Sequence, residues 1–544
     1  MNTDKGSSIW LSSSPWVSVK SVAKKTARLF FMGLASLTIA QAADFAFSEA
    51  TIDSLQARLA AGTLTSRELT AAYLARIAAI DKGGPAINAV IELNPDALAI
   101  AGQLDGERQA GRVRGPLHGI PVLIKDNIAT ADRMETTAGS LALVGAKPPR
   151  EAAIVARLRA AGAVILGKTN MSEWANYRST NSISGWSGRG GQTRNPYALD
   201  RNPSGSSSGS AVAVTANLCV VAVGTETNGS IMSPASVNGV VGVKPTVGLV
   251  SRTGIIPIAA SLDTAGPMAR TVRDAALLLE AISGPDESDA VTQTRPTAMG
   301  TDFAANLPAH ALKGARLGLV RGPFGFRPNM EPVVAAMLDA LRAAGAEVID
   351  LGEVTTLRDA SEPSGIVLSF EFKDGLNAYL ATLGPDAPVK SLADLIAFNE
   401  AHRGREMPLF AQELLLRSQG RGPLTDQAYL DALATAQRVT RKDGIDALMD
   451  KHNLDALVAL TTGPAALTDP VNGGYSTGSS SSPAAVAGYP SVTVPAAQVM
   501  GLPVGFSFFG RAWSEAKLLA LAADFEAHTH ARREPQFLPT VKVL

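Results

Sequence analysis

Cysteine is nearly absent from this chain of 544 residues, in which Cys219 stands alone. One cysteine can build neither an intrachain disulfide framework nor a cysteine metal site. Because Cys219 lies in the apolar run 218–223, we expect a small core residue there. The sequence also lacks His, Cys and carboxylate clusters at metal spacing and a phosphate-binding glycine fingerprint after a strand, so it predicts no metal and no cofactor.

An excess of charge is missing as well, because 49 Lys and Arg balance 49 Asp and Glu. Nucleic-acid binders neutralise phosphates with surplus basic residues, so we expect no nucleic-acid partner. Charged residues make up only 18% of the chain and apolar residues 46%. This composition excludes a disordered chain and predicts a large globule with a substantial core.

The N-terminus lacks an apolar run long enough to cross a bilayer. A basic segment at 20–28 is followed by an uncharged stretch at 29–40 and by the small-x-small tripeptide Ala40-Gln41-Ala42. This order is typical of a secretory signal peptide, and about a dozen apolar residues make a poor permanent anchor. We expect a signal peptide at 1–42 and a periplasmic or secreted protein at 43–544, without a stable membrane anchor. An amphipathic N-terminal helix of a cytosolic protein is the alternative, and the true translation start stays open.

The first part of the remaining chain alternates between helical and strand patterns. Thr65 to Glu68 matches a capping box, and Leu69, Tyr73, Ile77 and Ile80 follow at helical spacing. Further helices are expected at 95–112 and 151–161, and short apolar strands at 120–124 and 163–166. Such alternation predicts parallel strands that helices cover on both faces.

The rest of the chain continues this pattern and adds a helical region. The Gly- and Ser-rich part from 182 to 253 contains apolar runs, so we interpret it as loops on a rigid sheet and not as a linker. A surface excursion is expected at 284–309 and a long helical block at 366–449. The other expected elements are a helix at 210–218, strands at 220–223, 315–320 and 347–350 with a helix between the last two, and strands at 456–459, 491–494 and 503–509. One α/β globule with an inserted or appended helical subregion accounts for this order.

The serine-rich segment at 203–210 precedes a helix, and two chemistries compete for it. Residues 205–209 read GSSSG and fit the G-x-S-x-G pattern, which would make Ser207 the nucleophile of an α/β-hydrolase. That mechanism needs an acid and a histidine further along the chain. None of the downstream histidines lies in a glycine-rich loop; they are His310, His402, His452, His528 and His530.

A longer constellation supports the second interpretation. The stretches 119–127 (GIPVLIKDN), 203–210, 224–231 (GTETNGSI) and 239–246 (GVVGVKPT) together resemble the amidase signature family. The resemblance extends from about residue 50 to 530. Within this family, the chain looks most like the bacterial peptide amidases, on the stretches 184–187 (SGWS), 191–197 (GQTRNPY) and 391–399 (SLADLIAFN).

The resemblance implies a fold and a set of site residues. The fold would be a single-domain α/β structure with a central mixed β-sheet covered by helices on both faces, here at 43–544. The implied Ser-cisSer-Lys triad consists of Lys125, Ser206 after a cis peptide bond, and the nucleophile Ser230. The implied oxyanion hole consists of the backbone N–H groups of Thr227, Asn228, Gly229 and Ser230, and Ser207 would hydrogen-bond within the triad. The reaction needs no cofactor.

Elementary chemistry agrees with these roles. A serine hydroxyl needs an adjacent base, and lysine can serve when burial lowers its pKa towards neutrality. Without the resemblance, Lys125 at a strand end would be taken for a solvated charge. We expect Asp126 and Asn127 to be structural hydrogen-bonding residues. The aromatic residues Trp174, Tyr177 and Trp186, with the loop 184–191, either line a cleft or fill the core.

The sequence therefore predicts an exported serine amidohydrolase. Its substrate would be the C-terminal carboxamide of a peptide, cleaved through an acyl-enzyme on Ser230 with release of ammonia. The alternatives are an amidase of other acyl or aryl amides, a glutaminase subunit of a tRNA-dependent amidotransferase, and a non-catalytic peptide-binding protein. Acyl specificity and oligomeric state stay open.

The signal-peptide pattern generates the first prediction. Exported protein should begin after Ala42 or Ala43, since cleavage follows the small-x-small tripeptide. Mass spectrometry of the protein recovered from the periplasm checks this. An intact N-terminus at Met1 in that fraction would contradict it.

Overall fold

One mixed β-sheet of eleven strands organises the residues that the computed structural model describes, 45–321 and 326–542. The strand order is β1-β3-β2-β6-β8-β7-β12-β13-β11-β9-β10. The predicted signal peptide at 1–42 lies outside the described residues. The strands of this sheet are β1 Val90–Leu93, β2 Pro121–Lys125, β3 Val164–Thr169, β6 Val221–Glu226, β7 Val241–Lys244, β8 Thr264–Ala269, β9 Arg316–Leu319, β10 Glu347–Asp350, β11 Ala456–Leu460, β12 Ser491–Val499 and β13 Leu502–Phe509.

Parallel pairing is confined to two regions of the sheet. β2 lies between β3 and β6 and pairs with both in parallel, as the alternating pattern predicts, and β9 pairs in parallel with β10 and β11. The pairs between these regions are antiparallel. Every residue of β2, β3 and β6 is buried. The expected mixed sheet is confirmed, and the last residue of β2, Lys125, lies among covered strands.

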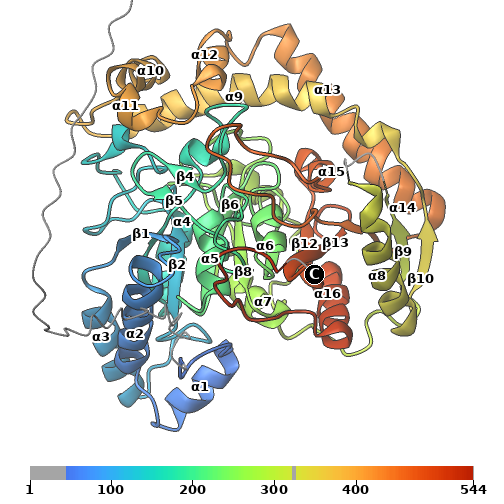
Figure 1. Ribbon diagram of the computed structural model, residues 1–544, viewed down its shortest axis with the longest axis horizontal. Helices are drawn as coiled ribbons and strands as arrows, with labels where there is room; N and C mark the ends of the chain where they lie inside the picture. Colours follow the sequence, from blue (N-terminus) through green and yellow to red (C-terminus); the bar gives the residue numbers. More distant parts are fainter. Residues whose placement is uncertain (1–44, 322–325, 543–544) are drawn as a thin grey trace, which may run out of the picture. The chain divides into compact units, whose positions relative to one another are not determined.

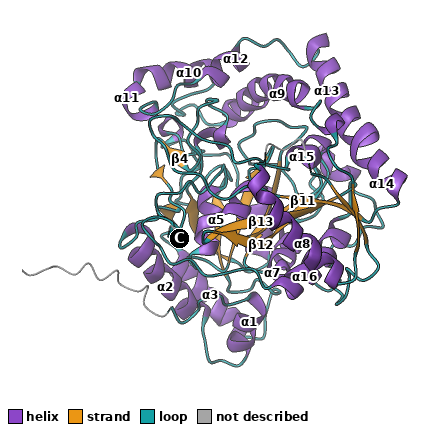
Figure 2. Ribbon diagram, turned by 45° about the vertical axis from the view of Figure 1, so that its right-hand side comes forward, coloured by secondary structure: helices purple, strands orange, loops and turns teal. Residues whose placement is uncertain are grey.

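Helices cover both faces of the sheet, and a second helical layer lies beyond one end of the strands. Figure 1 shows α9, α10, α12 and α13 along the top of the view, and Figure 2 shows the sheet below them. The α-helices are α1 Ile52–Ala60, α2 Ser66–Arg76, α3 Ala97–Gln109, α4 Ala153–Ala160, α5 Ser208–Thr215, α6 Met232–Val237, α7 Val272–Ile282, α8 Glu331–Ala343, α9 Ser361–Thr382, α10 Leu392–Ala401, α11 Arg403–Glu406, α12 Glu413–Gln419, α13 Gln427–Thr440, α14 Asp446–His452, α15 Ser482–Ala487 and α16 Glu515–Thr529.

Local sequence signals account for several of these boundaries. The capping box that begins α2 is present, since Thr65 Oγ1 accepts from Glu68 N at 3.1 Å and Glu68 Oε2 accepts from Thr65 N at 2.9 Å. The helical block at 366–449 is confirmed as α9 to α13 with the start of α14. The expected surface excursion at 284–309 is tied into the body of the protein, because Asp289 and Phe303 are buried.

Three strands of the sheet were not expected: β1, β7 and β8. β8 contains Gly266 and Pro267, which weaken a strand pattern, yet it pairs with β6 and β7. Gly266 allows this close pairing, because a Cβ there would lie 2.0 Å from Val243 O. Tertiary packing outweighs local propensity at this position.

A buried ion pair attaches the helical layer to the loops above the sheet. Arg178 is fully buried, and its guanidinium donates to the Glu173 carboxylate and to the backbone carbonyl of Glu406 at the end of α11. The same guanidinium lies over the rings of Trp186 and Phe410, 5.2 and 4.2 Å from their centroids. Burial raises the pKa of Glu173 well above its usual range despite Arg178. One cation thus serves two chain segments.

Removal of this cation should destabilise the protein strongly. Arg178→Met leaves Glu173 and Glu406 buried without their cation, and uncompensated buried charge costs about 3 kcal/mol or more. Arg403→Met, which removes an exposed partner of Glu400, should cost less than about 1 kcal/mol. Urea unfolding measures both variants. Equal midpoints for the two variants would contradict the prediction.

Candidate active site

Lys125 ends β2 with a fully buried side chain. Its Nζ lies 2.7 Å from Ser206 Oγ, 2.8 Å from Thr225 Oγ1 and 3.1 Å from Thr225 O. Burial lowers the pKa of Lys125 to about 7, against the opposing influence of Glu226 and Asp263. Lysine and serine therefore meet in a dry environment where the amine is partly neutral at physiological pH.

Ser206 and Ser207 precede α5 and contact β6 in different ways. The peptide bond between Gly205 and Ser206 is cis, as the resemblance implies. Ser207 Oγ donates to Thr225 O at 3.0 Å and accepts from Thr225 N at 3.2 Å. The hydroxyl of Ser207 thus binds the backbone of β6 and no triad side chain, and it contacts no histidine. Its N–H donates to Ser230 O at 3.1 Å.

Ser230 lies in the turn after β6 and is 7% exposed. Its carbonyl is held by Ser207 N, whereas its hydroxyl has no hydrogen-bond partner among the described residues. No hydrogen bond joins the hydroxyls of Ser206 and Ser230 in this part of the chain. The structure therefore brings Lys125 and Ser206 into direct contact and connects Ser230 to them through the backbone of Ser207.

Backbone amides in this turn divide into two groups. The Glu226 carboxylate accepts from Ile231 N at 2.7 Å and from Met232 N at 3.0 Å. The four preceding N–H groups, 227–230, donate to no acceptor within the described residues. Buried N–H groups without an acceptor are uncommon, and such groups aimed at one point stabilise a developing oxyanion. The turn has the donors that the predicted oxyanion hole requires.

The shape of the turn depends on Gly229 and Asn228. Gly229 has φ +82°, and a Cβ there would lie 2.8 Å from Ser481 Oγ. The Asn228 amide donates to Ser482 Oγ at 3.1 Å and accepts from Ser481 Oγ at 3.1 Å. The start of α15 therefore supports the turn from the opposite half of the sheet.

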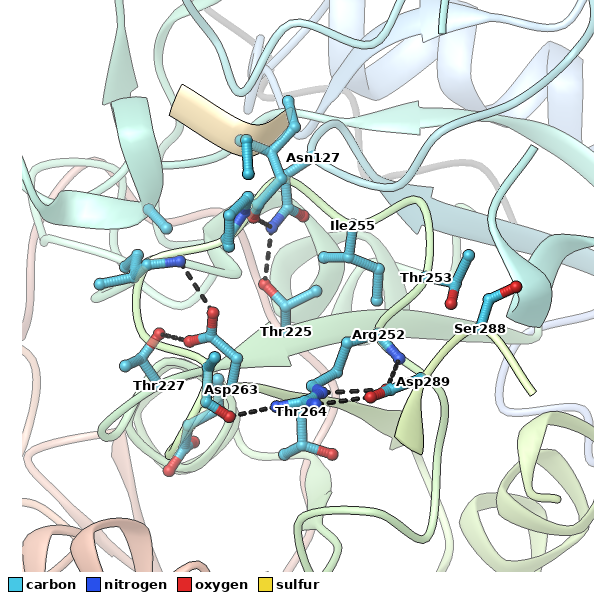
Figure 3. Close-up of a pocket in the computed structure, with 17 residues that line it drawn as sticks. Asn127, Thr225, Thr227, Arg252, Thr253, Ile255, Asp263, Thr264, Ser288 and Asp289 are labelled. Carbon is cyan, nitrogen blue, oxygen red and sulfur yellow. Dashed lines mark hydrogen bonds and ion pairs between the residues drawn. The ribbon is translucent and has the colours of Figure 1, made fainter. Parts of the chain in front are cut away.

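A cavity of about 400 Å³ lies beside this turn. Figure 3 shows Asn127, Thr225 and Thr227 on one side of it, and Arg252, Asp263 and Asp289 on the other. Asn127 Nδ2 donates to Thr225 Oγ1 at 3.0 Å, so the cavity reaches the residue that also binds Lys125. Its volume suits a small organic group.

Comparison with known proteins decides the family. The family model described as Amidase matches residues 68–519. The chain belongs to the amidase family. It is 42% identical to a probable amidase of Arabidopsis thaliana over 91% of this chain and 93% of that protein. The GatA-type relative, a glutamyl-tRNA(Gln) amidotransferase component of Chloroflexus aurantiacus, is 36% identical over 89% of this chain and 98% of its own.

A solved structure shows the same fold. The native peptide amidase from Stenotrophomonas maltophilia is 54% identical, with a TM-score of 0.87 over 91% of this chain and 99% of that one. This similarity and the family match establish an amidase, a hydrolase of amide bonds, on the α/β fold expected from the resemblance. The amidase is similar to bacterial peptide amidases, as the three stretches named above indicated.

Three residues of the cavity were missed by sequence reasoning: Arg252, Asp263 and Asp289. The Arg252 guanidinium binds the Asp289 carboxylate at 2.5 and 2.9 Å. Asp263 accepts from Thr227 Oγ1 at 2.5 Å and from the backbone N–H groups of Ile258 and Ala259. Burial raises the pKa of Asp263 to about 6. These partners are distant in sequence, and no local pattern marks them.

The side chains with two open interpretations are now placed. Trp174, Tyr177 and Trp186 are 2%, 9% and 8% exposed and belong to core clusters of the amidase, so they fill the core. Asp126 accepts from Thr137 Oγ1 and Gly139 N, and is structural as expected. Asn127, expected to be structural, also lines the cavity.

Metal and membrane features were searched in the described part of the amidase. It contains no group of three or more His, Cys, Asp or Glu side chains that could hold a metal ion. Within the same residues, none of the helices has the length and hydropathy needed to cross a bilayer.

The turn at Gly229 generates a prediction. Gly229→Ala should lower kcat about tenfold or more, because the positive φ and the contact with Ser481 shift the N–H donors. Gly300→Ala is the control, since a Cβ there meets nothing within 4 Å. The double variant Gly229→Ala/Ser481→Ala relieves the contact alone and should recover part of the activity. Unaltered kcat in Gly229→Ala would contradict this account.

Proposed function

We propose that the amidase hydrolyses the C-terminal carboxamide of peptides and releases ammonia through an acyl-enzyme on Ser230. The observation that carries the proposal is the contact of the buried Lys125 with Ser206 beside a turn with four free N–H groups. Nucleophile, base and oxyanion donors are the parts that amide hydrolysis needs. The triad roles of Lys125, Ser206 and Ser230 belong to this proposal.

The hydrogen bonds of Lys125 suggest the direction of proton transfer. A neutral amine has two N–H donors and one lone pair. Thr225 O and Thr225 Oγ1 take the two donors, so the lone pair faces the hydroxyl of Ser206. Ser206 can then donate its proton to Lys125 while it accepts the proton of Ser230.

The reaction proceeds in two stages. Ser230 Oγ attacks the carboxamide carbon, its proton passes through Ser206 to Lys125, and the N–H groups of 227–230 bind the oxyanion. Lys125 returns the proton to the departing nitrogen, so that the C–N bond breaks and ammonia leaves. Water then attacks the acyl-enzyme by the same proton path, and the peptide acid is released.

Similarity to a peptide amidase supports a peptide as the acyl group. The relatives also include a probable amidase and a component of an amidotransferase, so other acyl or aryl amides and glutamine are the alternative substrates. We further propose that the enzyme works in the periplasm or outside the cell, on the signal-peptide pattern at 1–42. Charged tRNA and the partner subunits of the amidotransferase are cytosolic, so export argues against the glutaminase role.

The lowered pKa of Lys125 predicts the pH dependence. Because only the neutral amine accepts a proton, kcat/KM should rise with pH through an apparent pKa near 7 and then level off. Lys125→Ala should lose about 10²-fold or more in kcat/KM and lose this limb.

Lys244→Met is the matched control for this prediction. Lys244 is also fully buried with its pKa lowered to about 8, but its Nζ donates to Pro245 O. A folded Lys244→Met protein should keep the limb near 7. An unchanged limb in Lys125→Ala would remove the lysine from the mechanism.

Ammonia release from a panel of amides tests the substrate class. Peptide amides should show the highest kcat/KM, above glutamine, aryl amides and fatty acyl amides, and Ser230→Ala should release none. A fluorophosphonate should label Ser230 and leave Ser207 unmodified. Preference for another amide would overturn the substrate class and leave the triad standing, whereas a label on Ser207 would overturn the triad.

A further inference from the structure

A second cavity of about 350 Å³ lies next to the first. Arg252 and Ala260 line both cavities and form the wall between them. The other walls come from α13, from the residues after α15 and from the turn before α16. The catalytic serines and Lys125 do not line this cavity, so the mechanism proposed above does not explain it.

Three polar side chains of this cavity have no hydrogen-bond partner in the described part of the chain. Arg441 Nε donates to Ala487 O at 2.8 Å, but neither terminal nitrogen of its guanidinium has an acceptor. The side-chain amide of Gln437, one helical turn earlier, has none, and neither has the indole N–H of Trp513. All three side chains are half-buried.

Arg441 supplies the cavity with an uncompensated positive charge. The other cation, Arg252, is neutralised by Asp289. Asp446 is engaged by Tyr489 OH at 3.0 Å and by Arg511, and Glu371 is held by Ser261 and Tyr429. Burial lowers the pKa of Arg441, but an arginine stays charged at neutral pH.

The backbone around the cavity adopts conformations with a cost. Trp513 has φ +67°, a left-handed conformation that a bulky residue rarely adopts. Arg441 begins a π-helical segment, Arg441–Ile445, at the end of α13. A Cβ on Gly488 would lie 3.5 Å from Arg441 Nη2, so glycine leaves room beside the guanidinium. Such features concentrate where side chains are held for a ligand.

We propose that this cavity binds a small carboxylate with an apolar body. The planar guanidinium of Arg441 matches the two oxygens of a carboxylate, and Gln437 and Trp513 add neutral donors. Val247, Val291 and the ring of Trp513 provide apolar walls for the rest of the molecule. A single unpaired cation fits a carboxylate better than a phosphate, which carries more charge. The proposal does not depend on the substrate of the first cavity.

Calorimetric titration of the full-length Ser230→Ala protein with phenylacetate tests the site. We expect saturable binding of one molecule, and binding about tenfold or more weaker for 2-phenylethanol, a neutral molecule of similar size. Arg441→Gln should weaken phenylacetate binding by the same factor. Arg511→Gln, which removes a nearby arginine paired with Asp450, should leave it unchanged.

Further variants keep the test decisive if Arg441→Gln fails to fold. Trp513→Phe and Gln437→Leu each remove one neutral donor and should weaken binding several-fold, with thermal unfolding as the folding control. Absence of binding by phenylacetate at millimolar concentrations would overturn the proposal. Equal affinity in Arg441→Gln would also overturn it and place the carboxylate in the first cavity.

Discussion

Burial of the Lys125 amine at the end of β2 is the constraint on which the rest of the site depends. A dry strand end between β3 and β6 disfavours the ammonium form, and only the Thr225 carbonyl and two hydroxyls surround Nζ. Charged residues that would restore the ammonium, Glu226 and Asp263, are occupied by backbone N–H groups and Thr227. The fold thereby keeps a strong base close to neutral and beside a serine.

Glu226 connects this base to the turn that follows β6. Its carboxylate takes the N–H groups of Ile231 and Met232, which fixes the start of α6 behind Ser230. The preceding N–H groups are then left to face a ligand, and Gly229 lets the chain turn there. One acidic side chain thus organises donors that it does not itself contact.

Sequence reasoning predicted the parts of this structure that local patterns encode. The capping box at Thr65, the apolar strands around Lys125 and the helical block from α9 onward each carry their own periodicity. β8 carries none, because its Gly266 and Pro267 are stabilised by partners from elsewhere in the chain. Lys125 and Ser206 were found through the resemblance, whereas Arg252, Asp263 and Asp289 meet only in the folded chain. Ser207 differs from expectation for the same reason, since its hydroxyl bonds to the backbone of β6.

The hydroxyl contacts between Asn228 and the start of α15 place the reacting serine on a seam. On one side lie β6 and the strands that hold the lysine, and on the other lie β11, β12 and β13 with α15. Catalytic competence therefore reports whether these halves are docked in register. A perturbation that only loosens the docking, such as mild denaturant, would silence the enzyme while most of its secondary structure persists.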